Sequence, residues 1–525
     1  MSDSTSAHTA SLEKPFGAID EDLEKQLDGG DSTAPTTAEE GATGESPASR
    51  GLEDKAQPAR PTLPPGRLAD DDPLSPVSWT TGKKILVDMV LNLWVLSLTY
   101  SSTAYVASVP ALIGRFGVSR TVALLGVTLQ VLGFAAGPLI FGPSSELYGR
   151  RPVYTACGLF YSAFAFGVCF APSMAGLLVF RFLVGFFGSA QINNVPASIG
   201  DFSTPASRGP YSIVYAICAF GGPTLGPLCS AFIETDVGYR WNLRVMAIFC
   251  TVTSILAAFV PETHHPTLIR RRAEKESGEV VARKSASDVL RVYKGALSRP
   301  FIFLFTEPIV LFVSLYLSVL YGILYGFFPA FSVVWVETRG WSAKSFGLTY
   351  ISLGLGFVLG AVAQAILGTK LYVSAIKKAA ERGDSTVPAE ARLSLVLVGS
   401  IICPLSLFLF AWTAPYPDVH WIVPCIGEAL FGTSMLLVFT SCIPYLIDAY
   451  QMHAASALAA GMASRALIGC VFPLFTLPMY HRLTVQGATS LFAGISCLCV
   501  PIPVLFMRYG PGLRQRSRYA AAHKA

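Results

Sequence analysis

Two long apolar runs are joined by the segment Gly142-Pro143-Ser144-Ser145-Glu146-Leu147-Tyr148-Gly149-Arg150-Arg151-Pro152. Gly142 allows helices to approach each other closely, and Gly149 allows a tight turn. Glu146 lies near the end of the first run, where it could cap the N-terminus of a neighbouring helix or pair with an arginine. A plain basic loop would explain the arginine pair but neither the glycines nor Glu146. We therefore expect this segment to latch one side of the protein in one conformation.

The two runs belong to a series that fills most of the chain. Of its 525 residues, 52% are hydrophobic and 14% are charged, and the mean hydropathy is +0.51. Soluble domains carry about a quarter charged residues, so membrane spans of roughly 20 residues explain the length better. The runs fall near residues 85–113, 121–144, 152–171, 174–199, 210–233 and 243–261, then 301–331, 343–368, 393–414, 420–446, 455–479 and 487–507. We predict an all-α membrane protein with twelve transmembrane helices.

Basic residues in the loops predict the orientation. Residues 1–78 are polar and are expected to form a disordered tail without a cleavable signal peptide. Beyond this tail, Lys and Arg are more than three times as frequent in the loops on the side of the termini as in the loops on the other side. The positive-inside rule then places both termini in the cytoplasm, and we expect a multi-pass protein of the plasma membrane.

The two halves of the chain resemble each other. One constant shift places Asp201 on Asp448, and another places Gly137 on Gly356. Together with the six-plus-six pattern, these matches indicate two six-helix bundles around a shared central cavity. The expected boundaries are a cytoplasmic tail at 1–78, bundles at 79–263 and 301–508, a cytoplasmic linker at 264–300, and a cytoplasmic tail at 509–525.

Two further segments bear on the mechanism. Arg181 lies inside the fourth run, where an unpaired charge costs at least ~2.5 kcal/mol, so it should face the bundle interior and hold an acidic or carbonyl partner. The fifth run contains Gly221-Gly222-Pro223-Thr224-Leu225-Gly226-Pro227. Its glycines and prolines remove bulk and backbone donors, which predicts a kinked and closely packed helix.

These motifs resemble those of the major facilitator superfamily. The segment around Glu146 is similar to its signature loop, with Glu at a position that is usually Asp. The run around Arg181 is similar to a motif whose Arg is associated with proton coupling, although a purely structural Arg stays possible. The fifth-run motif resembles the one that marks antiporter branches, with Pro227 in place of the last Gly. The resemblance covers about residues 73–515 and is strongest to fungal twelve-span drug:proton antiporters.

The resemblance implies a cavity lined by the first, fourth, seventh and tenth spans. Tyr321 and Tyr325 are four residues apart and should share a helix face. Such faces suit amphipathic or cationic substrates, although helix packing would explain the tyrosines equally well. The candidate cavity residues are Asn92, Gln191, Asn193, Asn194, Glu307, Tyr316, Tyr321, Tyr325 and Glu428, and those for proton coupling or gating are Arg181, Glu146, Arg150, Arg151, Gly222, Pro223 and Gly226.

The two acidic candidates differ in depth. Glu428 lies several residues inside the tenth span, which suits proton transfer or cation binding, but pairing with Arg465 of the eleventh span is an equal alternative. Glu307 lies near the cytoplasmic end of the seventh span, and a structural role is favoured for it.

The leading interpretation is a proton-coupled efflux transporter of small organic molecules such as drugs, polyamines or fungal secondary metabolites. The alternative is a dedicated exporter of one endogenous metabolite, an organic acid or a glycolipid, from a biosynthetic gene cluster. Embedded carboxylates favour cations and a cavity-facing arginine favours acids, so the sequence leaves the substrate open. It shows no nucleotide-binding loop, metal-ligand cluster or nucleophile motif, and we expect no enzymatic activity, cofactor or metal. The expected partners are protons, the small-molecule substrate and the lipid bilayer, with no nucleic acid, and the protein is expected to be a monomer.

Overall fold

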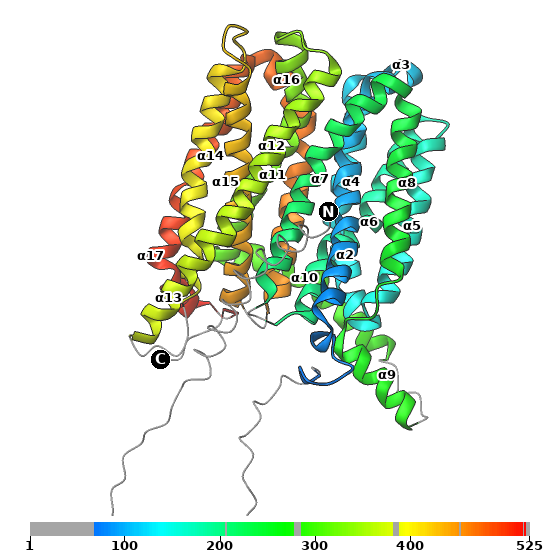
Figure 1. The fold of residues 1–525 in the computed structure, drawn as a ribbon, viewed down its shortest axis with the longest axis vertical. Helices are drawn as coiled ribbons and strands as arrows, with labels where there is room; N and C mark the ends of the chain where they lie inside the picture. Colours follow the sequence, from blue (N-terminus) through cyan, green and yellow to red (C-terminus); the bar gives the residue numbers. More distant parts are fainter. Residues whose placement is uncertain are drawn as a thin grey trace, which may run out of the picture. The chain divides into compact units, whose positions relative to one another are not determined.

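The computed structural model describes residues 68–204, 207–277, 285–381, 388–450, 453–517 and 519–520. Within these ranges the chain is helical and forms no strand (Figure 1). Most of the predicted N-terminal tail lies outside the described residues, as does part of the predicted C-terminal tail. The first described element is the short helix η1 (Pro76–Ser78).

The first half forms six long helices. Local sequence sets several of their ends: the side chains of Ser119 and Ser173 accept hydrogen bonds from backbone N–H groups of the first helical turn. Gly149 has a φ of 98°, which lets the chain turn directly from one span into the next. The helices are α2 (Thr81–Ala104), continued by η2 (Tyr105–Ser108) and α3 (Val109–Phe116), then α4 (Arg120–Tyr148), α5 (Arg150–Phe170), α6 (Met174–Phe202), α7 (Arg208–Val237) and α8 (Tyr239–Ala258).

The second half repeats this arrangement with more irregular ends. Its first span, α11 (Pro308–Ser332), runs into a π-helical turn, η3 (Val333–Thr338), and its second, α12 (Ala343–Ala363), continues through η4 (Gln364–Gly368) into α13 (Thr369–Glu381). The remaining elements are η5 (Ala389–Leu393), α14 (Ser394–Thr413), α15 (Ile422–Tyr450), α16 (Ala454–Cys499) and α17 (Pro501–Arg516).

Helix α16 contains two spans. The described residues hold 11 continuous helical stretches long and apolar enough to cross a membrane, one fewer than predicted. Thr484, inside α16, has non-helical torsions with φ 63° and ψ 170°. Two distances show that the chain folds back there: the Tyr480 hydroxyl lies 2.7 Å from the Thr489 hydroxyl, and the rings of Phe472 and Phe492 are 5.6 Å apart. A straight helix would separate the latter pair by about 30 Å, so the predicted twelve spans are present.

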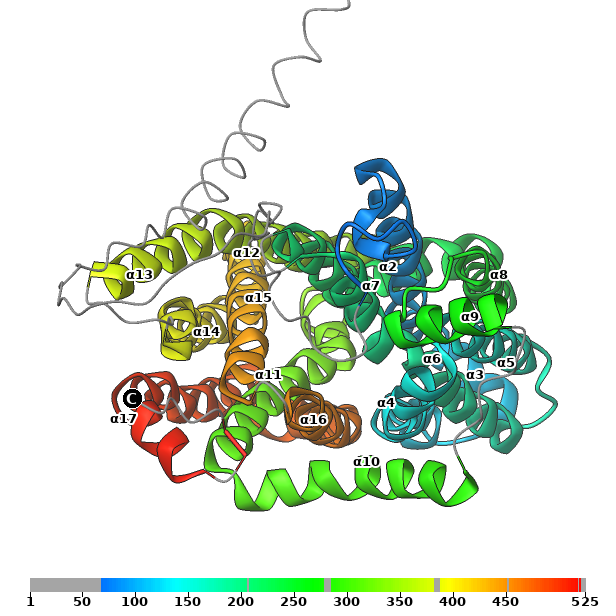
Figure 2. The same ribbon diagram turned by 90° about the horizontal axis from the view of Figure 1, so that it is seen from below.

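The linker between the halves is largely helical. Helix α9 (His265–Ser277) and helix α10 (Ala286–Thr306) lie on either side of residues 278–284, which are outside the described residues. Glu307 interrupts the helix with φ −109° and ψ 102° before Pro308 opens α11, as a residue before proline favours. The predicted bundle boundary at residue 301 therefore falls inside α10. This helix packs against α4 of the first half and α11 and α16 of the second (Figure 2).

Each half packs as a bundle, and the two bundles have matching internal contacts. Helix α4 packs against α6, as α12 packs against α15. A Cβ atom on Gly137 of α4 would collide with the carbonyl of Phe186, and one on Gly356 of α12 would collide with that of Ala429. These are two glycines that the sequence repeat aligned, so the repeat reflects equivalent helix contacts. The bundles meet where α4 packs against α16 and α7 against α12 (Figure 2).

Candidate functional site

The segment 142–152 forms a charge cluster at the end of the molecule where α2 begins and α9 and α10 lie, here called the linker end. The guanidinium of Arg150 donates to the Asp201 carboxylate at 3.2 Å and to the Ser145 hydroxyl. Glu262 accepts hydrogen bonds from the backbone N–H groups of Arg150 and Arg151, at 2.8 and 3.3 Å. This carboxylate caps the N-terminus of α5, where the helix dipole favours a negative charge. The cluster thus ties α4, α5 and α6 to the end of the sixth span.

Glu146 does not make the contacts that we expected of it. Its side chain is exposed at the linker end, whereas Glu262 caps the neighbouring helix and Asp201 pairs with Arg150. Glu262 lies directly against the turn at Gly149, and Glu146 acts on Arg150 only through electrostatic attraction, without a hydrogen bond. Its predicted gating role stays a prediction.

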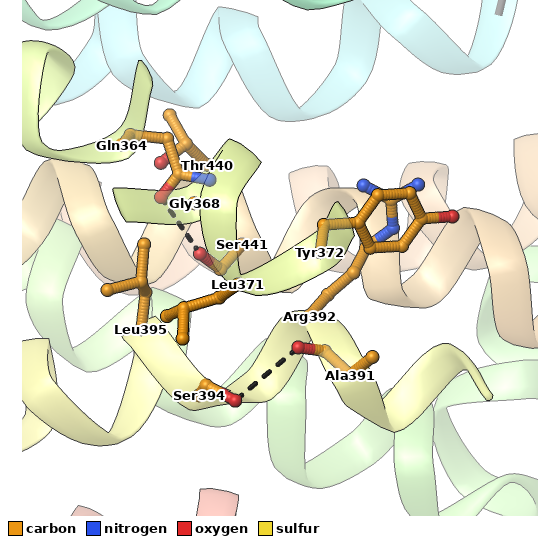
Figure 3. Close-up of a pocket in the computed structure, with 10 residues that line it drawn as sticks. All are labelled: Gln364, Gly368, Leu371, Tyr372, Ala391, Arg392, Ser394, Leu395, Thr440 and Ser441. Atoms are coloured by element: carbon orange, nitrogen blue, oxygen red, sulfur yellow. Dashed lines mark hydrogen bonds between the residues drawn. The ribbon is translucent and has the colours of Figure 1, made fainter. Parts of the chain in front are cut away.

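The second bundle contains an equivalent pair. Arg392 pairs with Asp448 and stacks on the Tyr372 ring, with its guanidinium carbon 4.4 Å from the ring centroid. Asp448 is the residue that the repeat matched to Asp201. Figure 3 shows Arg392 and Tyr372 in a small pocket with Gln364 and Ser441, whose side chains are hydrogen-bonded at 3.2 Å. This pocket lies inside the second bundle, and we treat it as part of that bundle's packing.

Arg181 is completely buried and bonded to backbone carbonyls. Its Nε donates to the carbonyl of Gly126 at 2.9 Å, and its two terminal nitrogens donate to those of Ser101 and Ser102 at 2.9 and 3.2 Å. Ser101 and Ser102 belong to the last turn of α2, where carbonyl groups lose helical partners. The Tyr105 ring covers the guanidinium at 4.5 Å. Of the acidic or carbonyl partner that the sequence predicted, the structure shows carbonyls, and Arg181 holds the end of α2 against α4.

The fifth-span motif brings α7 into backbone contact with α2. A Cβ atom on Gly222 would lie 2.9 Å from the backbone nitrogen of Tyr100, and one on Gly226 would lie 2.8 Å from that of Ala104. Pro227 has no N–H group, so the carbonyl of Pro223, four residues earlier, lacks its helical donor. The Thr103 hydroxyl of α2 donates to this carbonyl at 2.9 Å. The departure from the family motif at Pro227 is therefore matched by a compensating side chain.

The polar residues of the fourth span bond within the first bundle. The Gln191 amide, in its better-satisfied orientation, pairs with the Trp94 backbone carbonyl and indole N–H at 2.6 and 2.8 Å. Asn194 accepts from the Ser145 hydroxyl at 3.2 Å and donates to the Phe141 carbonyl at 3.4 Å. Asn193, which is partly exposed, donates to Asn194. These contacts bind the helices of one bundle together, as polar side chains commonly do in membranes.

The aromatic pair of the seventh span lies at the interface between the bundles. The rings of Tyr321 and Tyr325 are 4.8 Å apart, and the Tyr325 hydroxyl lies 3.1 Å from that of Ser102 in α2. The shared face that the sequence predicted is thus present. Tyr316 instead donates to Ser400 at 2.9 Å inside the second bundle.

Neither acidic candidate of the second bundle contacts this aromatic pair. Glu428 is buried and accepts hydrogen bonds from the Trp335 indole, at 3.2 Å, and from the Ser352 hydroxyl, so the proposed pairing with Arg465 is absent. Glu307 accepts from the Tyr450 hydroxyl at 3.0 Å, which joins the start of α11 to the end of α15.

Two embedded ionisable residues, Asp88 and Arg465, were missed as site candidates. Asp88 of α2 is buried, and its carboxylate oxygens form no well-aligned hydrogen bond in the described part of the chain, although the Asn92 amide is close enough to interact with them. Asn92, predicted as a cavity residue, lies one turn further on, and its amide also has no bonded partner among the described residues. Arg465 of α16 lies with its guanidinium carbon 5.6 Å from the ring centroids of both Tyr321 and Phe439. Asp88 and Arg465 could have been identified as site candidates from the sequence, because each is an ionisable residue inside an apolar run.

Ion pairs join the bundles at the other end of the molecule, here called the distal end, where α4 and α12 begin. Lys344 of α12 pairs with Asp236 of α7, and Arg120 of α4 pairs with Glu337 of η3 at 3.6 Å. All four side chains are exposed by 39 to 57%. Exposed ion pairs contribute only about 0–1 kcal/mol each, so this connection can open at low cost.

Comparisons with known proteins agree with this architecture. The family model of the Major Facilitator Superfamily matches residues 90–473. The chain is 41% identical over 448 residues to the "Efflux pump FUBT" of Fusarium oxysporum, covering 84% of this chain and 74% of that protein. It is 39% identical over 465 residues to the "Major facilitator superfamily multidrug transporter mdrA" of Aspergillus fumigatus, covering 87% of this chain and 76% of that one.

A solved structure supports the same fold. The proton:xylose symporter XylE bound to 6-bromo-6-deoxy-D-glucose aligns with a TM-score of 0.59 over 82% of this chain and 96% of that one, at 17% identity. The motifs, the paired six-helix bundles and the family match over most of its length show that this chain belongs to the major facilitator superfamily.

Proposed function

We propose that the protein exports small organic molecules across the plasma membrane in exchange for protons, with both termini in the cytoplasm. The relatives named as an efflux pump and a multidrug transporter support export. The linker end then faces the cytoplasm and the distal end faces the exterior. The alternative, a dedicated exporter of one endogenous metabolite, uses the same fold and mechanism and differs only in the breadth of substrates.

The contrast between contacts within and between the bundles carries this proposal. Within the bundles, the charged groups of Arg181, Arg150 and Arg514 are buried and bonded, the last to both oxygens of Glu390 at 2.9 and 2.7 Å. Between them, the described polar contacts of the spans are the exposed ion pairs of the distal end, a hydrogen bond from Arg120 to the Ser332 hydroxyl at that same end, and a hydroxyl contact at Ser102. Two internally rigid bundles that are joined by few and weak polar contacts can rock against each other about a central site, which alternating access requires.

The described conformation corresponds to closure at the distal end. Both inter-bundle ion pairs lie there, while Glu146 at the linker end is exposed. We assign this arrangement to the inward-facing state, in which substrate enters from the cytoplasm.

Asp88 is the side chain best placed to carry the proton. A buried ionised carboxylate without a partner is costly, whereas its neutral form is tolerated. Asp88 faces α7, where it interacts electrostatically with Tyr211 and Cys218, and α7 is the helix that contacts the second bundle through α12. Movement of α7 would change the access of water to Asp88, so its proton occupancy could follow the transport cycle.

Reconstituted vesicles containing the full chain test this function. An imposed pH gradient should drive uphill movement of phenylbutyrate, phenylbutyramide or phenylbutylamine, and an uncoupler should stop it. Asp88→Asn should abolish uphill movement but retain exchange of the same probe down its own gradient. Asp288→Asn, which removes an exposed acid on α10, is the matched control and should behave as the wild type. Uphill transport that survives the uncoupler, or that is normal in Asp88→Asn, would contradict the coupling mechanism.

A further inference from the structure

Arg465 differs from the other arginines embedded in the spans. Arg181 donates to three carbonyls, and Arg150 pairs with a carboxylate. In the part of the chain that the structure describes, no carboxylate or other hydrogen-bond acceptor is within bonding distance of the Arg465 guanidinium, whose neighbours are aromatic rings. The side chain is only partly buried, so its N–H donors are not enclosed by protein.

The position of Arg465 along α16 places it deep in the membrane. It lies 11 residues after the helix begins at Ala454, which corresponds to about 16 Å of helical rise. An embedded cation costs about 2.5–3.5 kcal/mol at the centre of a span. Contact with the Tyr321 and Phe439 rings recovers part of this cost, but it leaves the five N–H donors of the guanidinium without acceptors.

The surroundings of Arg465 combine rings from both bundles. Phe439 contacts Phe220 of α7, with ring centroids 4.8 Å apart, and Phe220 also contacts Phe357 of α12 at 5.8 Å. On the other side of the guanidinium, the Tyr321 hydroxyl donates to that of Tyr325 at 3.4 Å. A cationic fork is thus set beside an apolar aromatic wall and a pair of hydroxyl groups.

We propose that Arg465 binds the carboxylate of the transported molecule, and that the substrates are organic acids with an apolar or aromatic body. This inference rests on the export function proposed above and specifies its substrate class. A guanidinium binds a carboxylate through two parallel N–H···O bonds. The Phe220 and Phe439 rings are buried against each other in the described conformation, and they become a surface for the rest of the molecule when the bundles move apart. Embedded Glu428 does not oppose this preference, because it is bonded to Trp335 and Ser352 and has no contact with the aromatic pair of α11.

The placement also explains how binding could influence the bundles. Arg465 and Phe439 belong to the second bundle and Phe220 to the first. A molecule held by the guanidinium and resting on Phe220 contacts both bundles at once. Its binding energy therefore acts on the same interface that must rearrange during transport.

Three probes that share a phenylbutyl body and differ only in their polar group would test which charge the site prefers. Phenylbutyrate carries a carboxylate, phenylbutyramide is neutral and phenylbutylamine is cationic. Binding of each probe to the purified full chain would be measured by titration, together with pH-driven transport in vesicles. We expect the wild type to bind phenylbutyrate at least tenfold more tightly than the amide or the amine. Arg465→Gln should weaken phenylbutyrate binding at least tenfold, or about 1.4 kcal/mol, and should leave amide binding within twofold.

Two variants control for charge and folding. Arg465→Lys keeps the charge but loses the planar fork, so its phenylbutyrate affinity should fall between those of the wild type and Arg465→Gln. Arg482→Gln removes an exposed positive charge from the same helical element and should bind phenylbutyrate as the wild type does. Unfolding temperatures of all variants would show whether the bundle is intact.

The outcomes that overturn this inference are distinct from those that contradict export. Wild-type protein that fails to bind phenylbutyrate, or an Arg465→Gln variant that binds it normally, refutes the carboxylate site. If the amine is nevertheless moved uphill by a pH gradient, the export function stands and only the substrate class is wrong. If none of the probes is bound or moved, both proposals fail.

Discussion

Replacing Arg181 separates a structural role from a role in proton coupling. The side chain makes three hydrogen bonds to backbone carbonyls, two of them in the last turn of α2. Arg181→Met keeps most of the side-chain volume but removes every donor. Arg181→Lys keeps the charge, but a single ammonium group cannot reproduce the geometry of three separated donors.

The magnitude follows from the number of bonds lost. Interhelical hydrogen bonds in membranes contribute about 0.6–1.7 kcal/mol each, so loss of all three should lower the free energy of unfolding by about 2–5 kcal/mol. The lysine variant should lose about two thirds of that amount, because its ammonium can replace only one of the three donors well. The carbonyls of Ser101 and Ser102 would be left at the break between α2 and η2, which should loosen this segment first.

Thermal unfolding in detergent and transport in vesicles would measure the two roles separately. The unfolding temperature should decrease in the order wild type, Arg181→Lys, Arg181→Met, with Arg482→Met as an exposed control that is unchanged. If Arg181 acts only by holding α2, the surviving transport of the lysine variant should keep the pH dependence of the wild type. An Arg181→Met protein as stable as the wild type would refute the bonding argument, and normal stability with lost pH dependence would restore the coupling role.

Two further predictions concern packing and a buried ion pair. Gly222→Val should prevent the close approach of α7 and α2, because even a Cβ atom would collide with Thr99 and the adjacent backbone. Overpacking of this kind costs about 1–3 kcal/mol, so the variant should show a lower unfolding temperature and reduced transport. Wild-type values of both would contradict the contact. Glu390→Gln should lower the free energy of unfolding by about 3–5 kcal/mol, because it leaves the Arg514 charge buried without its partner. The double variant Glu390→Gln with Arg514→Met should recover part of that loss in the same unfolding assay, and an unaffected single variant would show that the pair is hydrated.

The hydrogen-bond partners of the polar side chains could not be predicted from the sequence alone. We expected Glu146 to cap a helix, but Glu262, from the end of the sixth span, occupies that position. Gln191 and Asn194 were expected in the cavity but face Trp94 and Ser145 inside the first bundle. Each outcome depends on the rotation of a helix about its own axis, and a span that is apolar on all sides gives weak information about that rotation.

The sequence by itself determined the number of spans, the pairing of the halves and the family. Span length and apolar character are properties of consecutive residues, because a bilayer requires about 20 of them whatever the partners are. Only the tertiary structure decided that Thr103 bonds the carbonyl freed by Pro227, across 120 positions of sequence, and that Arg465 faces rings while Arg181 faces carbonyls. From the sequence alone, both arginines are charged side chains inside a membrane span and have the same expected free-energy cost of burial in the bilayer. What distinguishes them is the set of groups that distant helices bring within hydrogen-bond distance, and that set exists only once the bundles have packed.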